Sequence, residues 1–312
     1  MRLSVIDIGT NTVLLLIADV DPDGRVHVVY DGHAIPRLGR GVDEHRSIPP
    51  ESVARVLQCL RDYDELSHRY QAEAIIACGT SALRDASNKE EFRQRVKDEL
   101  GFDVVILSGE REAELTYLGA VSQFMETDAR GRFAVLDIGG GSTELTLGAG
   151  TAIESRQSLE IGCVRLTERI LKTSPPSSLA MSLCLKELRT ALQPLRILSS
   201  TASLIGVAGT LTTLASIDLA LDQYDAARVN GHRLTTETVK SIFNKLRIRS
   251  VEEIRAIPQV HPGRADILLA GILILMETMD MLGVNEVTVS DRGLRYGIAA
   301  WKGTELTGVK RA

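Results

Sequence analysis

VLDIGGGSTELTL, at residues 135–147, interrupts an apolar, strand-like run with three glycines and two hydroxyl residues. An acidic residue stands on each side of the interruption, Asp137 before it and Glu144 after it. Glycines have no Cβ, so consecutive backbone N–H groups can form a concave nest for phosphate oxygens. The stretch therefore predicts a strand–turn–strand whose turn binds phosphate. The predicted phosphate-binding residues of this turn are Gly139, Gly140, Gly141, Ser142 and Thr143.

A related pattern stands at the start of the chain. VIDIGTNT at residues 5–12 matches VLDIGGGS at residues 135–142 at a constant offset, with Asp7 in the place of Asp137. A tight turn alone gives no reason for this pattern to recur between two strands. We therefore expect a duplicated domain with one such turn of each copy facing a shared cleft; accidental similarity within a single fold is the alternative. The phosphate-binding residues predicted in the first copy are Gly9, Thr10, Asn11 and Thr12.

Strand-like and helix-like segments alternate along the chain, which predicts an α/β fold. At 312 residues the chain exceeds the usual size of one hydrophobic core. We expect one domain at residues 1–125 and a second at residues 126–312, whose last helix is free to pack back on the first. The polar segment 126–132 is the expected linker. Strands are expected at 2–7, 13–20, 26–30, 72–78, 104–107 and 203–207, and helices at 50–70, 88–101, 110–125 and 267–276.

Composition and charge exclude several classes of protein. A net charge of −5 gives no general attraction to nucleic acid or to an anionic membrane. The four cysteines are far apart, which argues against a disulfide framework or a zinc site. Asp7 interrupts the apolar core that a signal peptide needs, and the apolar run at residues 267–276 is too short for a membrane span. The expectation is a soluble cytoplasmic protein that binds neither nucleic acid nor membrane.

The acidic residues around the two turns suggest a metal ion. Asp7 and Asp137 end strands just before their turns, and Glu144 lies on the same hairpin as Asp137. Mg²⁺ prefers one or two carboxylates together with phosphate oxygens. We expect these three residues to hold it, the alternative being that the aspartates only cap strand ends.

A third loop of small residues, GVAGTLTT at 206–213, follows a short strand and opens a helical pattern. Free N–H groups at such a helix start attract anions. Gly209 and Thr210 are therefore expected to add a third phosphate contact.

Seven motifs, in order along the chain, resemble the exopolyphosphatase / guanosine pentaphosphate phosphohydrolase (Ppx/GppA) family of the actin-like superfamily. They are DIGTNT (7–12), TSALRDASN (80–88), SGEREAE (108–114), DIGGGSTE (137–144), GTLTTLA (209–215), PGRADILLAG (262–271) and SDRGLRYG (290–297). The resemblance implies two actin-like (ribonuclease H-like) domains around a central cleft. It also implies Mg²⁺ or Mn²⁺ as cofactor and K⁺ as an activator, and it leaves a homodimer open.

The resemblance also assigns roles. Glu112 matches the family's general base, although without the resemblance Glu110 and Glu114 would be equal candidates. Arg84 matches a cleft arginine, expected to screen phosphate charge; a surface ion pair with a nearby acid is the alternative. Arg264 matches a family position expected to bind phosphate, but whether it touches substrate or a neighbouring helix is open.

Two residues depart from the family pattern. Arg111 stands where many members carry an acid, and it is expected to lower the pKa of Glu112 or to bind phosphate. Tyr296 replaces a common glutamate, with no consequence that the sequence reveals. The chain also lacks the additional helical domains of longer members, from which a preference for short polyphosphate chains is expected.

The function that these residues imply is Mg²⁺-dependent hydrolysis of the terminal phosphoanhydride of inorganic polyphosphate. Conversion of guanosine pentaphosphate (pppGpp) to ppGpp is the nearest alternative, because no guanine-reading motif separates the two substrates. An actin-like kinase or ATPase and a non-catalytic polyphosphate or alarmone sensor are the remaining alternatives. The kinase would need an acceptor-activating aspartate and an adenosine pocket, neither of which the sequence identifies.

Overall fold

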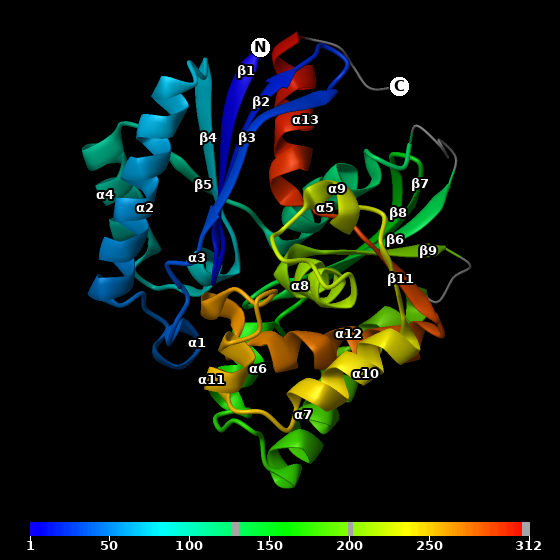
Figure 1. Cartoon of the computed structure of the whole chain (residues 1–312). Coiled ribbons are helices and arrows are strands. Elements are labelled where there is room, and N and C mark those ends of the chain that lie inside the picture. Colours follow the sequence, from blue (N-terminus) through cyan, green and yellow to red (C-terminus); the bar gives the residue numbers. More distant parts are fainter. Residues whose placement is uncertain (126–130, 199–201, 308–312) are drawn as a thin grey trace. The chain divides into compact units, whose positions relative to one another are not determined.

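The computed structural model describes residues 1–125, 131–198 and 202–307 (Figure 1). The chain divides into two compact units. Unit 1 comprises residues 1–119 and the chain from residue 294, and unit 2 comprises residues 120–293. Residues 126–130 of the predicted linker lie outside the described residues, and Arg132 already belongs to strand β6.

Unit 1 contains a five-stranded sheet in the order β3-β2-β1-β4-β5. Strands β1 (Arg2–Ile8), β2 (Val13–Val20) and β3 (Val26–Ala34) form an antiparallel meander. Strands β4 (Ala74–Gly79) and β5 (Val104–Ile106) join it in parallel with β1. The carboxyl ends of β1, β4 and β5 therefore meet at one edge of this sheet.

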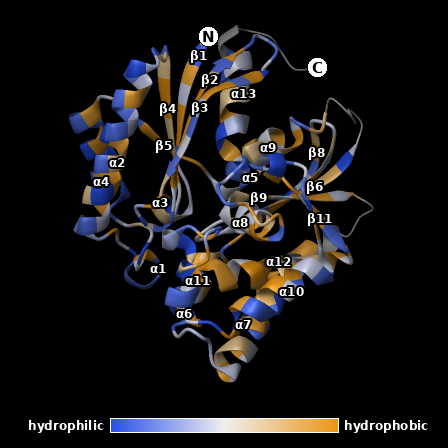
Figure 2. Ribbon diagram, viewed as in Figure 1, coloured by the Kyte–Doolittle hydropathy of each residue, from blue (hydrophilic) through white to orange (hydrophobic). Residues whose placement is uncertain are grey.

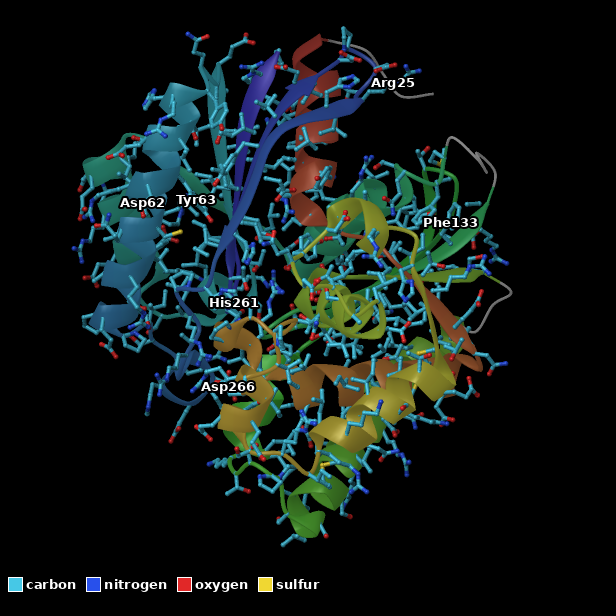
Figure 3. All side chains as sticks on the ribbon, viewed as in Figure 1. Arg25, Asp62, Tyr63, Phe133, His261 and Asp266 are labelled. Carbon is cyan, nitrogen blue, oxygen red and sulfur yellow. The ribbon has the colours of Figure 1, made fainter. Side chains whose placement is uncertain are left out.

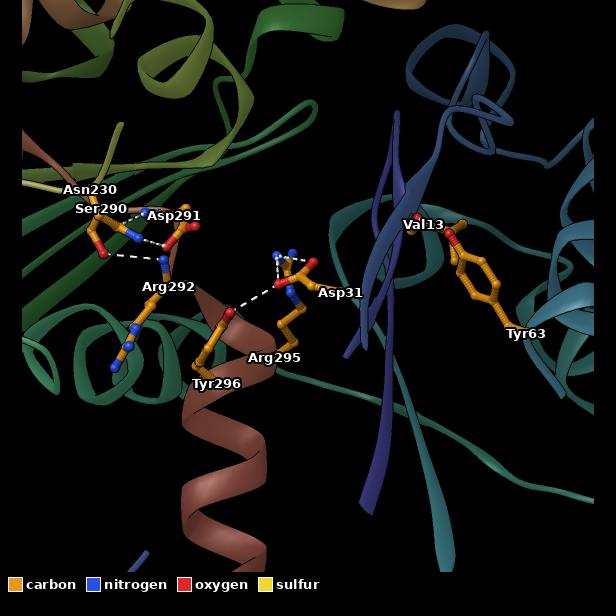
Figure 4. A network of polar contacts seen from close by, with 9 residues as sticks. All are labelled: Val13, Asp31, Tyr63, Asn230, Ser290, Asp291, Arg292, Arg295 and Tyr296. Atoms are coloured by element: carbon orange, nitrogen blue, oxygen red, sulfur yellow. Dashed lines mark hydrogen bonds and ion pairs between the residues drawn. The ribbon is translucent and has the colours of Figure 1, made fainter. Parts of the chain in front are cut away.

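Helices cover both faces of the unit 1 sheet. Ile6 and Ile8 of β1 belong to a core shared with α2 (Pro50–Arg69) and α4 (Lys89–Leu100). Tyr63 anchors α2 on this face by donating its hydroxyl to the Val13 carbonyl at 3.1 Å (Figure 4). Leu3 and Val5 pack on the other face against α5 (Gly109–Val121) and α13 (Leu294–Thr307). Short helices α1 (Val42–His45) and α3 (Ser81–Asp85) complete the unit.

Unit 2 contains a six-stranded sheet in the order β10-β11-β9-β6-β7-β8. Strands β6 (Arg132–Ile138), β7 (Thr143–Ala149) and β8 (Ala152–Leu159) again form an antiparallel meander. Strands β9 (Ser203–Val207) and β11 (Glu286–Val289) run parallel to β6, and β10 (Arg233–Thr235) pairs antiparallel with β11.

One face of the unit 2 sheet is buried by helices. Their core is centred on α12 (Leu268–Leu282), which is hydrophobic along almost its whole length (Figure 2). The observed helix extends six residues beyond the end of the helix predicted at 267–276. The other helical elements of the unit are α6 (Cys163–Arg169), α7 (Ser178–Ala191), η1 (Gln193–Leu198), α8 (Ala208–Asp218), α9 (Ala226–Val229), α10 (Thr236–Leu246), α11 (Val251–Arg255) and η2 (Pro262–Arg264).

The two sheets share one topology. Each begins with an antiparallel meander whose first strand then pairs in parallel with a strand that follows a crossover. Unit 2 adds only β10 at the far edge. This common order confirms the predicted α/β class and agrees with duplication better than with accidental similarity. Among the described residues, no helix is long and apolar enough to cross a membrane.

Candidate active site

Glu112 lies in the first turn of α5, directly after the carboxyl end of β5. Ser108 starts this helix, because its Oγ accepts a hydrogen bond from the Arg111 N–H at 3.2 Å and its carbonyl accepts one from the Glu112 N–H at 2.9 Å. Acids are favoured in a first helical turn by the positive end of the helix dipole. Glu110 in the same turn is exposed, whereas Glu112 is buried. Glu114, the third candidate, is half-buried and lies beside Arg111, so burial distinguishes Glu112 from the two acids that the sequence alone leaves equal to it.

Arg84 is the partner of the buried Glu112 carboxylate. It follows β4 on α3, and its Nη1 donates to Glu112 Oε2 and, at 3.1 Å, to the Leu107 carbonyl. Burial raises the pKa of Glu112, and the charge and hydrogen bond of Arg84 oppose this shift without cancelling it. A carboxylate with a raised pKa is a stronger base than an exposed one and is suited to accept a proton from water.

Arg111 does not act on Glu112 in the way that its sequence position suggested. Its Nη1 lies 2.8 Å from Glu114 Oε1, and its guanidinium lies 4.6 Å from the ring centroid of Trp301 on α13. The pKa of Glu112 is raised and Arg111 is not among the groups that shift it. The expected lowering of this pKa by Arg111 is therefore wrong, because the side chain is engaged by α13 and by the next acid of its own helix.

The first predicted phosphate turn closes the β1–β2 hairpin. The Gly9 N–H donates to the Thr12 carbonyl at 2.9 Å, and a Cβ on Gly9 would lie 2.8 Å from that same oxygen. The Thr10 and Asn11 carbonyls accept from the backbone N–H groups of Gly39 and Arg37, at 2.8 and 3.1 Å. The C=O and N–H of a trans peptide point in opposite directions. The Asn11 N–H shares a peptide with the Thr10 carbonyl, and the Thr12 N–H shares one with the Asn11 carbonyl. Both amides are therefore directed away from the segment that contains Arg37 and Gly39.

Asp7 lies on the sheet face that carries α5 and α13. Side chains alternate between faces along a strand, so Asp7 follows Leu3 and Val5 of that face. The same face holds the buried Arg295, whose Nη2 donates to both Asp31 carboxylate oxygens at 2.8 Å (Figure 4). The Tyr296 hydroxyl donates to Asp31 Oδ2 at 2.9 Å. Tyr296, which departs from the family pattern, thus helps to fasten the start of α13 to β3.

The second predicted phosphate turn, in unit 2, repeats the geometry of the first. The Gly139 N–H donates to the Ser142 carbonyl at 3.0 Å, and a Cβ on Gly139 would lie 2.9 Å from that oxygen. Its carbonyls are bound by the start of α6: Gly139 O by the Cys163 N–H at 3.0 Å, and Gly140 O by the Val164 N–H at 2.8 Å. Arg165 Nε donates to the third carbonyl, Gly141 O, at 2.8 Å.

The three bound carbonyls fix the direction of three consecutive amides of this turn. Because each peptide directs its N–H opposite to its C=O, the amides of Gly140, Gly141 and Ser142 all point away from α6. This is the concave row of donors that a phosphate nest requires. The Thr143 side chain is used differently, since its hydroxyl donates to the Ile161 carbonyl at 2.6 Å and is fully buried.

Asp137 and Glu144 stand directly opposite each other in the β6–β7 ladder. Opposite residues of an antiparallel pair share one face, and two like charges there are destabilising unless something offsets them. Glu144 is buried, and the Ser158 hydroxyl donates to its Oε1 at 2.7 Å. Within the described residues no group of three or more His, Cys, Asp or Glu side chains is placed to hold a metal. The opposed pair offers two carboxylates, a number that fits Mg²⁺ because this ion keeps several waters.

The third predicted loop opens α8 and brings Arg264 to it. A Cβ on Gly209 would lie 2.7 Å from the Arg264 Cζ and Nε, so the guanidinium lies directly against this glycine. Arg264 ends the turn η2, which His261 precedes as its N-cap, and Asp266 lies two residues beyond Arg264 (Figure 3). Ala208 precedes Gly209 with a φ of 71°, a strained conformation for a residue with a Cβ. Such strain is typical of functional sites.

Sequence reasoning missed residues that support the site from behind. Arg165 binds Gly141, and Ser158 binds Glu144. Nothing in the local sequence marks them, because each comes from a segment that reaches its partner only through folding of the sheet. Gly162 offered a weak signal: a Cβ there would lie 2.4 Å from the Gly140 carbonyl, so glycine is needed where α6 meets the turn.

Comparison with known proteins identifies relatives along the whole chain. Exopolyphosphatase 2 of Mycobacterium tuberculosis is 36% identical over 96% of this chain and 97% of its own length. The guanosine-5'-triphosphate,3'-diphosphate pyrophosphatase of Vibrio vulnificus is 29% identical, and the match covers 97% of this chain but 59% of that protein. The crystal structure of an exopolyphosphatase from Cytophaga hutchinsonii is 31% identical, with a TM-score of 0.89 over 99% of both chains.

These structural likenesses confirm that the two units have the predicted actin-like (ribonuclease H-like) fold. The model of the Ppx/GppA phosphatase family matches residues 16–302 of this chain. The matched region contains Arg84, Glu112, Asp137, Glu144 and Arg264. The chain therefore belongs to the Ppx/GppA phosphatase family.

Proposed function

We propose that this protein is an exopolyphosphatase, which hydrolyses the terminal phosphoanhydride bond of inorganic polyphosphate and releases orthophosphate. The observation that carries the proposal is the buried Glu112–Arg84 pair in a chain of which 96% matches an exopolyphosphatase. The pyrophosphatase relative is less similar and extends well beyond the matched region. Polyphosphate is therefore the favoured substrate, and pppGpp is the comparison that the test must include.

In the proposed reaction Glu112 accepts a proton from a water molecule as the water oxygen attacks the terminal phosphorus. The bond to the bridging oxygen breaks, and the shortened polyphosphate leaves with that oxygen. Such a transition state is loose, so positioning and charge stabilisation matter more than covalent chemistry. The donors and positive charge proposed for the phosphate oxygens are Arg84 in unit 1 and, in unit 2, the amides of residues 140–142 and Arg264 beside Gly209.

We propose that Asp137 and Glu144 hold Mg²⁺, with Asp7 as the acid expected to assist from unit 1. The metal would neutralise phosphate charge, and the opposed carboxylates are the observation that favours it. Mn²⁺ and K⁺ stay expectations from the family resemblance. We also propose a cytoplasmic location, since the four cysteines are free and buried, as in proteins of reducing compartments.

Phosphate release from medium-chain polyphosphate and from pppGpp, each with Mg²⁺, tests this proposal. The wild type should release phosphate faster from polyphosphate, and Glu112→Gln should lose at least about 10²-fold in kcat because the general base is gone. Glu110→Gln is the matched control, since it removes an exposed acid of the same helical turn and should keep its activity.

Faster turnover of pppGpp than of polyphosphate would reverse the substrate assignment. Equal loss in both variants would remove Glu112 from its role as base. Tight binding of polyphosphate with no turnover by the wild type would make the protein a sensor.

A further inference from the structure

Arg165 is a buried cation directly behind the GGGST turn. Its side chain is only 5% exposed, and its Nε donates to the Gly141 carbonyl at 2.8 Å. Burying a guanidinium costs free energy, and a partner that the structure shows is the highly exposed Glu160, whose Oε2 lies 3.6 Å from Nη2. The hydrogen bond to Gly141 brings this buried charge into contact with the turn.

The two copies of the turn differ in the group that binds their third residue's carbonyl. Asn11 and Gly141 are equivalent positions of the duplicated turns. In unit 1 the Asn11 carbonyl accepts from a backbone N–H, that of Arg37, at 3.1 Å. In unit 2 the equivalent Gly141 carbonyl accepts from the Arg165 side chain. A neutral backbone donor in one copy is thus replaced by a charged, buried side-chain donor in the other.

The peptide that Arg165 holds is one whose amide faces the proposed phosphate. Gly141 O and the Ser142 N–H belong to the same trans peptide and point in opposite directions. A donor fixed on the carbonyl therefore fixes the direction of the amide. It also polarises the peptide, because hydrogen bonds in a low-dielectric interior strengthen one another. The charge itself adds attraction for an anion on the far side of the turn.

We propose that Arg165 is a positioning residue of the substrate site: it holds the Gly141–Ser142 peptide so that its amide donates to a substrate phosphate, and its buried charge raises phosphate affinity. This inference rests on the proposed function of the turn as a phosphate nest. Arg165 acts through the peptide and is not a catalytic residue.

The experiment measures binding of inorganic triphosphate with Mg²⁺ by calorimetry. It uses the Glu112→Gln protein as the parent, so that hydrolysis does not consume the ligand. Arg165→Met removes the charge and the donor while it keeps a long apolar side chain, and Arg165→Lys keeps the charge but not the Nε–H. The matched control is Arg169→Met, which removes an exposed cation from the same helix, 4.0 Å from Glu187.

We expect Kd to rise about 10- to 100-fold in Arg165→Met, the range typical of residues that orient metal ligands. The Kd of Arg165→Lys should lie between those of Arg165→Met and the parent, and the Kd of Arg169→Met should equal that of the parent. In the active background, Arg165→Met should raise KM more than it lowers kcat. A merely structural role would instead lower the denaturation midpoint and leave the Kd of the folded protein unchanged.

A folded Arg165→Met protein that binds triphosphate within twofold of the parent would overturn the inference. Should that variant fail to fold, Arg165→Lys decides, because parental affinity without the Nε–H would refute the positioning role. A parent that does not bind triphosphate at all would instead refute the proposed function of the turn, so the two failures are distinguishable.

Discussion

Adding a single methyl group at Gly297 should disturb the active site by changing how α13 packs against α5. On α13, a Cβ at this position would lie 1.8 Å from the Leu115 carbonyl oxygen, 2.6 Å from its carbon and 3.2 Å from the Gly119 nitrogen. All three atoms belong to the backbone of α5, which cannot turn away as a side chain can. Gly297→Ala must therefore push the two helices apart by more than 1 Å, because a Cβ essentially never lies within 3.0 Å of another heavy atom.

The size of the effect follows from two opposing contributions. Overpacking of a tight contact costs about 1–3 kcal/mol, and the rigid backbone partner places this case near the upper end. Alanine is favoured over glycine within a helix by about 1 kcal/mol. The net loss in the free energy of unfolding of unit 1 should be about 2 kcal/mol. Because Glu112 lies one helical turn before Leu115, the shift also displaces the proposed base, and displacement by about 1 Å costs about 10²-fold in kcat.

Urea unfolding followed by tryptophan fluorescence is the assay for stability. Trp301, the single tryptophan of the chain, lies on α13 one turn beyond Gly297 and reports on unit 1. Gly293→Ala is the matched control, since a Cβ there meets nothing within 4 Å. A Gly297→Ala protein with the midpoint of this control and the kcat of the wild type would refute the close crossing of α5 and α13.

Three further predictions concern individual contacts. The acidic limb of the pH profile of kcat/KM should have its midpoint above the ordinary pKa range of a glutamate, because burial raises the pKa of Glu112. Arg84→Gln should move this midpoint to still higher pH, because Arg84 lowers that pKa. An unchanged midpoint in the variant would contradict the interaction between Arg84 and Glu112. Tyr296→Phe should reduce the free energy of unfolding by about 1 kcal/mol, because it removes the hydrogen bond to Asp31, and a thermal melt equal to that of the wild type would contradict this. The four cysteines should not react with Ellman's reagent at pH 8 until the protein is unfolded, because burial raises their pKa to about 11 for Cys59 and about 12 for the others; rapid labelling of the native protein would refute their burial.

Much of the fold could be predicted from local patterns. The strand–turn–strand units and the strand at 203–207 follow from apolar runs broken by glycine and hydroxyl residues, and they appear in the structure. The helix predicted at 110–125 begins at Gly109, because the Ser108 hydroxyl caps it, and ends at Val121. Strands β8, β10 and β11 were not predicted, since exposed or short strands carry weak patterns.

The candidate site was harder to predict than the fold. Arg84 and Glu112 follow different strands, and their pairing depends on the parallel order of β4 and β5. Arg165 reaches the turn only because α6 begins beside it. The expected lowering of the Glu112 pKa by Arg111 was wrong because Trp301, almost two hundred residues away, and Glu114 contact its side chain.

The sequence by itself determined the duplicated turns, because glycine spacing and strand periodicity are local properties that the chain carries in any context. It also determined the family, through seven ordered motifs. Only the tertiary structure decided which acid is buried, what shifts its pKa, and which carbonyls of the second turn are bound so that their amides face outward. Those properties arise from solvent exclusion and from hydrogen bonds between distant segments, and neither exists until the sheets and helices have packed.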